Sequence, residues 1–143
     1  MATASIPDLG LDLRKVPDLT DPATRKRLSP AAIVAFFKIV ASWNLKDEEA
    51  MALLGGVSRG RYYELKKSHK GMLSRDELTS VSLLIGIFKA LNIIFGRKLA
   101  DRWVSRPNSN PMFQDAAPLG TMIQGIPYLL NVRRLLDSRR GGR

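Results

Sequence analysis

Residues 47–67 read DEEAMALLGGVSRGRYYELKK, and they carry the most informative structural pattern in the chain. It has the pattern of two short helices joined by a glycine turn. Acidic residues begin the first helix, where carboxylates suit the helix dipole. A small residue, Ala50 or Ala52, lets two helices cross closely, and Gly55 or Gly56 supplies a turn with positive φ. The stretch predicts a helix-turn-helix, and the paired glycines leave two registers open, one residue apart.

The second of these helices carries the residue types that read DNA. Val57 is an apolar plug after the turn, and Ser58 is a helix cap. Polar and basic side chains at the start of a recognition helix reach base edges in the major groove, and later lysines meet phosphates. The predicted DNA-binding residues are Ser58, Arg59, Arg61, Tyr62, Lys66 and Lys67. The alternative interpretation is a solvated basic face, with the glycines merely ending a helix.

Positive charge gathers at this helix and at the end of the chain. The chain has 143 residues and a formal net charge of +10. Residues 58–75 hold a net +5, and residues 128–143 hold a net +4. A cationic excess implies an anionic partner, most often nucleic acid, but it says nothing about fold.

The remaining segments predict further helices and an all-α fold. Ser29-Pro30 has the pattern of a helix start, and Ile33 to Trp43 recur on one apolar face. Ser74 and Glu77 form a capping box that opens a helix ending near Gly96. Residues 119–136 predict a last helix, broken near Gly125. We therefore expect an N-terminal arm over 1–28, a helix-turn-helix domain over 29–72, and a dimerisation and partner-binding domain over 73–143.

The helix after Ser74 is apolar nearly all round, so it must be covered on both sides. In a chain this small a second subunit is the natural cover, and helix-turn-helix proteins usually meet two half-sites about 34 Å apart. We therefore predict a homodimer. The predicted dimer interface consists of Leu84, Ile87, Phe88 and Leu91.

Several functional classes are disfavoured by composition. The chain has no Cys and one His, His69, which excludes disulfide scaffolds, thiolate metal sites and multi-histidine metal sites. Phosphate loops, dinucleotide fingerprints and paired catalytic acids are missing from the sequence. Residues 81–96 are too short to span a bilayer and contain a lysine. We expect a cytoplasmic, non-enzymatic protein without cofactor, metal site or membrane association.

The last third of the chain carries a specific pattern. Trp103 is followed by Pro107-Asn108, Phe113, Pro118-Leu119, Gly125, Val132 and Leu135-Leu136. This spacing resembles the toxin-binding domain of the Xre/MbcA/ParS antitoxins. Residues 29–70, including EEAMALLGGVS, are similar to the family's Xre-type helix-turn-helix. The first 28 residues have no counterpart in the family.

The resemblance implies a type II antitoxin paired with a RES-domain toxin that degrades NAD. Such antitoxins are dimeric, block the toxin's active-site cleft, repress their own operon and form larger complexes with toxin. The implied toxin-binding residues are Arg133, Arg134, Leu135, Arg139, Arg140 and Arg143. The arginines either pair with acidic groups at the rim of the cleft or enter it, and we favour the rim. Removal of residues 128–143 is expected to abolish neutralisation and to spare operator binding. The alternative is a transcriptional repressor without a toxin partner.

Overall fold

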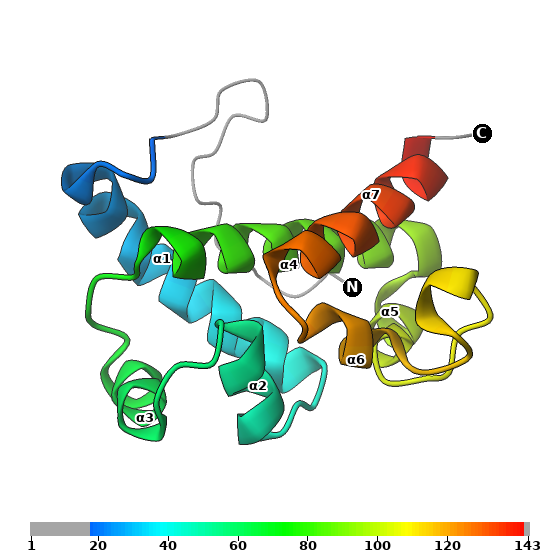
Figure 1. Cartoon of the computed structure of the whole chain (residues 1–143), viewed down its shortest axis with the longest axis horizontal. Coiled ribbons are helices and arrows are strands. Elements are labelled where there is room, and N and C mark those ends of the chain that lie inside the picture. Colours follow the sequence, from blue (N-terminus) through cyan, green and yellow to red (C-terminus); the bar gives the residue numbers. More distant parts are fainter. Residues whose placement is uncertain (1–17, 142–143) are drawn as a thin grey trace.

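The computed structural model describes residues 18–141, which contain helices and no strand. The predicted all-α fold is confirmed. The elements, drawn in Figure 1, are α1 (Pro22–Ser42), α2 (Asp47–Leu53), α3 (Arg59–Ser68), α4 (Arg75–Phe95), α5 (Arg97–Trp103), the 3-10 helix η1 (Pro111–Phe113), α6 (Pro118–Met122) and α7 (Ile126–Gly141).

Helix α1 begins eight residues earlier than predicted, at Pro22 instead of Pro30. The Asp21 carboxylate caps it by accepting from the Ala23 N–H at 3.1 Å, and Pro22 occupies its first turn. Ser29 is therefore not a cap. Its buried hydroxyl donates to the Arg25 carbonyl at 2.6 Å and accepts from the Leu73 N–H at 2.8 Å. The expected boundary at residue 28 falls inside α1, and residues 1–17 of the expected arm lie outside the described part of the chain.

Helix α4 is the centre of the molecule, crossed by α1, α5 and α7 (Figure 1). Its capping box at Ser74 and Glu77 is present as predicted. The four residues assigned to a dimer interface, Leu84, Ile87, Phe88 and Leu91, are all buried inside the single chain. The cover that an all-round apolar helix requires is supplied by α1 and α7, so these residues are not accessible to a second subunit. The apolar faces of α4 therefore give no reason to place a dimer interface at these four residues.

Among the described residues, α4 is the one helix whose length and composition would allow it to cross a membrane. Fifty-six per cent of its most apolar window is buried within the protein. This is the pattern of a core helix, because its apolar faces already have protein neighbours.

The segment between α5 and α7 forms a closed loop. The Leu119 N–H donates to the Val104 carbonyl at 2.9 Å, and the Asn108 N–H donates to the Ala116 carbonyl at 3.1 Å. Trp103 packs edge-on against Phe113, with ring centroids 5.7 Å apart. The break between α6 and α7 falls at Gly125, whose φ of +135° disfavours other residues. Residues of the C-terminal pattern thus close this loop and position α7 against α4.

Candidate nucleic-acid and protein-binding surfaces

Helices α2 and α3 form the expected helix-turn-helix. Ala50 is the small residue at the crossing, since it is fully buried, whereas Ala52 is partly exposed. Gly55 and Gly56 both have positive φ, +94° and +82°, so the turn uses both glycines. The Ser58 hydroxyl caps α3 by accepting from the Arg61 N–H at 3.2 Å. The turn and the helix cap of this motif follow from local sequence signals.

Arg61 is held by the protein itself. Its guanidinium donates to both carboxylate oxygens of Glu77, at 3.0 Å and 2.6 Å, and to the Met72 carbonyl at 3.2 Å. Burial opposes ionisation of Glu77, but the hydrogen bonds from Arg61 and Ser74 outweigh it and hold the pKa of Glu77 below its usual value. The hydrogen bond to Glu77 in turn raises the pKa of Arg61. In this geometry Arg61 ties α3 to α4 and is not directed to a base edge.

Tyr62 is also structural. Its ring is fully buried against Phe37, and its hydroxyl donates to the Asp47 carboxylate at 2.9 Å. Burial is the main reason that the pKa of Tyr62 is raised. Tyr63, which the sequence reasoning passed over, is the exposed aromatic residue of α3. The signal was available, because Tyr62 and Leu65 share the core face and Tyr63 lies four residues after Arg59.

Four side chains make the exposed basic face of α3: Arg59, Tyr63, Lys66 and Lys67. Arg59 and Lys66 each lie 5.9 Å from the centroid of the Tyr63 ring, within cation–π range. Arg59 also pairs loosely with Glu48 at 3.5 Å, with both side chains exposed. Such an exposed pair is weak, so Arg59 can exchange its carboxylate partner for a phosphate or a base edge.

Asp47, the first residue of α2, braces this face. Its carboxylate accepts from Tyr63 at 2.6 Å and from Lys66 at 3.2 Å, besides Tyr62. These hydrogen bonds, the one from Tyr63 foremost, lower the pKa of Asp47 to about 2. A charged Asp47 therefore fixes the angle between α2 and α3 at neutral pH. His69 ends α3 in the left-handed conformation and stacks on Phe37.

Two of the predicted toxin-binding residues on α7 are turned toward the core. The Arg133 side chain is only 19% exposed and pairs with Asp137 at 3.0 Å. Its guanidinium lies over Gly86 of α4, where an added Cβ would come within 1.6 Å of Nη1. Leu135 is partly buried against the core. Both residues therefore serve to dock α7 on α4, and the fully buried Leu129, Val132 and Leu136 complete the contact.

The other predicted arginines of α7 face outward. Arg134, Arg139 and Arg140 are exposed, and Arg143 lies outside the described residues. Tyr128 and Asn131 are exposed on the same side as Arg134, one helical turn apart, and these three define the outer face of α7. A groove of about 510 Å³, lined by Met112, Gln124, Tyr128 and Asn131 among others, continues this face toward η1. Tyr128 was missed because its position next to Pro127 suggested only a helix break.

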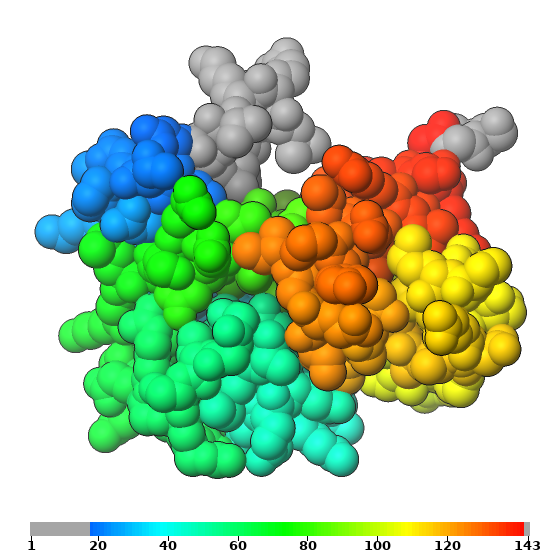
Figure 2. Space-filling view, in the orientation of Figure 1, coloured from blue at the N-terminus to red at the C-terminus, as the bar shows by residue number. Residues whose placement is uncertain are grey.

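The two surfaces lie on different parts of the molecule. In Figure 2 the α3 segment is at the lower left and the α7 segment is at the upper right. Between them, the turn around Gly55 and Gly56 borders a cleft whose other wall is the α6–α7 junction at Gly125 to Pro127. The basic face of α3 and the outer face of α7 can therefore be occupied by two different partners at once.

Comparison with known proteins agrees with this division. Residues 21–86 match the model of the antitoxin Xre-like helix-turn-helix domain, so residues 21–28, which were expected to have no counterpart in the family, do have one. Residues 90–142 match the model of the antitoxin Xre/MbcA/ParS C-terminal toxin-binding domain. The uncharacterized protein y4oB of Sinorhizobium fredii (strain NBRC 101917 / NGR234) is 36% identical over 125 residues, 86% of this chain and 95% of the relative. The resemblance inferred from the sequence is confirmed, and the chain belongs to the Xre/MbcA/ParS antitoxin family, with a helix-turn-helix domain and a toxin-binding domain.

Proposed function

We propose that the chain neutralises a cognate RES-domain toxin that degrades NAD, and that it represses its own operon by binding operator DNA. The observation that carries this proposal is the presence of two separate exposed surfaces on one core, one in each matched family domain. In this role the protein is cytoplasmic, binds and blocks, and catalyses nothing.

The basic face of α3 supports the operator half of the proposal. Its cations can neutralise phosphates, and Arg59 is placed to reach a base edge near the start of the recognition helix. Ser58 contributes only its capping hydroxyl, and Arg61 and Tyr62 act by fixing the position of α3. We therefore assign sequence readout to Arg59 and Tyr63, and phosphate contacts to Lys66 and Lys67.

The outer face of α7 supports the toxin half. Tyr128 offers an aromatic anchor that lines the groove, and Arg139 and Arg140 lie farther along, in the last turn of α7. We propose that Tyr128, Asn131 and Arg134 cover the toxin's active-site cleft while the terminal arginines pair with acidic groups around it. Arg134 stays in the predicted set, whereas Arg133 and Leu135 are assigned to docking within the chain.

We still propose a homodimer, but with an interface at exposed apolar residues instead of the buried face of α4. Ile93 at the end of α4 and Leu99 on α5 are the most exposed large apolar side chains among residues 18–141, at 62% and 56%. Substituting either by lysine leaves the core intact and should yield monomers in sedimentation. A dimer unchanged by both substitutions would place the contact elsewhere.

Co-expression with the toxin encoded beside this chain's gene tests the proposal. The tail deletion considered from the sequence is unsuitable, because removing residues 128–143 strips Leu129, Val132 and Leu136 from the core. The substitutions Tyr128→Ala and Arg134→Ala keep these contacts. We expect the unmodified chain to restore growth and to co-purify with the toxin, and the double variant to do neither while still folding.

The matched control is Lys67→Gln, an exposed charge change on α3 that should leave rescue intact. If no neighbouring gene encodes an NAD-consuming protein and nothing co-purifies, the alternative of a repressor without a toxin partner is favoured. If the double variant of α7 rescues growth fully, the assignment of the toxin surface to α7 is wrong.

A further inference from the structure

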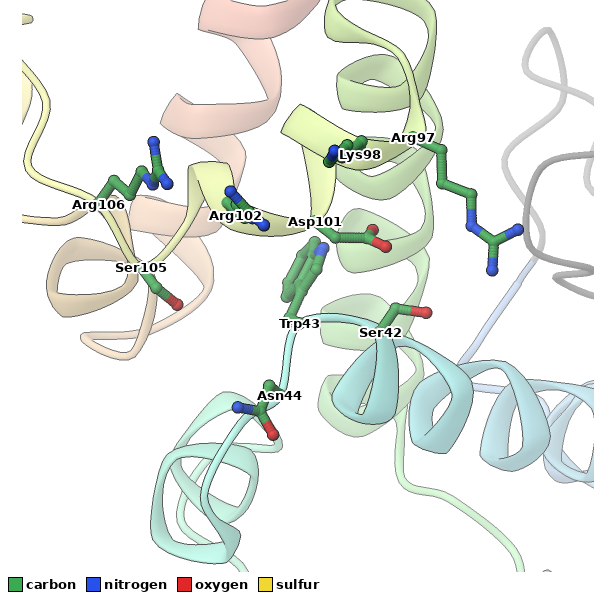
Figure 3. Close-up of a pocket in the computed structure, with 9 residues that line it drawn as sticks. All are labelled: Ser42, Trp43, Asn44, Arg97, Lys98, Asp101, Arg102, Ser105 and Arg106. Carbon is green, nitrogen blue, oxygen red and sulfur yellow. The ribbon is translucent and has the colours of Figure 1, made fainter.

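A cleft of about 710 Å³ lies between the end of α1 and α5, away from the outer face of α7. Figure 3 shows that its lining comes from Ser42 to Asn44 at the α1–α2 link, from α5, and from the residues after α5. The volume falls within the range of small-molecule sites, which is about 300–1,000 Å³. Neither proposed surface uses this cleft.

The cleft is strongly cationic. Arg97, Lys98, Arg102 and Arg106 line it, with Asp101 as the one acidic side chain among the lining residues. Within residues 18–141, Lys98, Arg102 and Arg106 form no ion pair. Like charges that line one cleft repel one another, so an anion bound among them would be stabilising.

Two buried polar atoms in the cleft have no partner. Trp43 is 2% exposed, and its indole Nε1–H finds no acceptor among the described residues. The Oδ1 atom of Asp101 is likewise buried and accepts no hydrogen bond. Figure 3 draws the Asp101 carboxylate and the nitrogen-bearing edge of Trp43 directed into the same part of the cleft. Buried donors and acceptors are rarely left unsatisfied, and a bound group with one acceptor and one donor would satisfy both atoms.

We propose that this cleft binds a nucleoside polyphosphate, whose base accepts a hydrogen bond from Trp43 and donates one to Asp101 while its phosphates meet the basic side chains. An amino-substituted base edge carries a donor beside an acceptor, which matches the two orphaned atoms. Arginine forks bind phosphate oxygens in pairs, which suits Arg102 and Arg106. The inference goes beyond the proposed antitoxin function and does not depend on it.

The chemistry of the cleft favours this ligand over the backbone of DNA. A backbone phosphate only accepts hydrogen bonds, so it would leave the Asp101 carboxylate without a donor. Burial raises the pKa of Asp101 and makes a neutral hydrogen-bonding partner such as a base more suitable there. Four cations around a volume of one nucleotide also match the closely spaced charges of a triphosphate better than the separated carboxylates of an acidic peptide.

Fluorescence of Trp43 tests the proposal directly. Trp103→Phe removes the other tryptophan of the chain, so the remaining signal comes from the cleft. We expect ATP to quench this signal saturably, and to bind at least tenfold more tightly than inorganic triphosphate. Trp43→Phe, measured by calorimetry, keeps most of the ring but loses the N–H, and should weaken ATP binding by about fivefold, the usual worth of one neutral hydrogen bond.

Charge variants give a second measurement that does not disturb the core. The exposed pair Arg102→Gln and Arg106→Gln should weaken ATP binding by tenfold or more, whereas Lys26→Gln, at the far end of α1, should leave it unchanged. Equal binding of ATP and triphosphate, or no saturable response, overturns the proposal. If the unmodified chain binds no ATP and the Arg102/Arg106 variant loses operator affinity, the cleft contacts the DNA backbone. That result would also overturn the proposal.

Discussion

The Arg61→Ala substitution tests whether Arg61 holds α3 in place or contacts a base of the operator. The guanidinium makes three hydrogen bonds to α4 and to the link before it, two of them to Glu77. If Arg61 holds α3 in place, its loss destabilises the whole fold. If it reads a base instead, its loss leaves stability unchanged and relaxes operator preference.

The exposed fractions of the two side chains decide the size of the effect. Removing one partner of a fully buried pair costs about 3–5 kcal/mol, whereas an exposed pair is worth up to about 1 kcal/mol. The Glu77 side chain is 9% exposed and that of Arg61 is 38% exposed, so solvent screens the pair on one side. We therefore expect a loss of about 2 kcal/mol in unfolding free energy. For a chain of this size that lowers Tm by roughly 6–10 °C.

Urea unfolding followed by circular dichroism measures this change, with Arg59→Ala as the matched control. Both side chains of the Arg59–Glu48 pair are largely exposed, so its loss should cost less than about 0.5 kcal/mol. Operator binding is then compared well below the lowered Tm. Arg61→Ala should keep its base preference, whereas Arg59→Ala should relax one position. An Arg61→Ala protein of unchanged stability with relaxed preference at one base would show that Arg61 reads DNA and does not hold α3 in place.

The sequence was sufficient where the determining signals are local. The turn at Gly55 and Gly56, the cap at Ser58 and the capping box at Ser74 each act within a few residues, and all are present in the structure. The α6–α7 break at Gly125 is local in the same way.

The sequence-based predictions missed contacts between a side chain and a segment that is distant in the sequence. Ser29 has the pattern of a cap, but its hydroxyl binds the Leu73 N–H, 44 residues away. The predicted interface residues on α4 are covered within the chain by α1 and α7, two helices that are distant from them in the sequence. Glu77 was explained by its capping box, so its contact with Arg61 was not anticipated.

Three further predictions concern charge, packing and pH. Lys67→Gln should weaken binding to all DNA sequences alike and lower the slope of log affinity against log salt by about 0.9, as expected for one lost phosphate contact; an unchanged slope would remove Lys67 from the interface. Gly86→Ala gains about 1 kcal/mol of helix propensity but displaces the Arg133 guanidinium, because the new Cβ would lie 1.6 Å from Nη1. Urea unfolding should therefore show a larger gain from Gly86→Ala in an Arg133→Ala background, and strict additivity would contradict the docking role of Arg133. The pKa of Asp47 is lowered to about 2 in the folded protein, so its contribution to stability is present above its unfolded pKa of about 3.9 and is lost as pH falls toward 2. The Tm of Asp47→Asn should accordingly fall less between pH 5 and pH 2 than that of the unmodified chain, and parallel curves would contradict the bracing role of Asp47.

Titrating the purified toxin with each variant and following NAD consumption shows whether separate faces of one core serve toxin and operator. The unmodified chain and the double variant Arg59→Ala, Lys67→Gln should stop NAD consumption at the same ratio of antitoxin to toxin. Tyr128→Ala with Arg134→Ala should leave the toxin active while still binding operator DNA. Full inhibition by the α7 variant, or loss of inhibition in the α3 variant, would contradict the account.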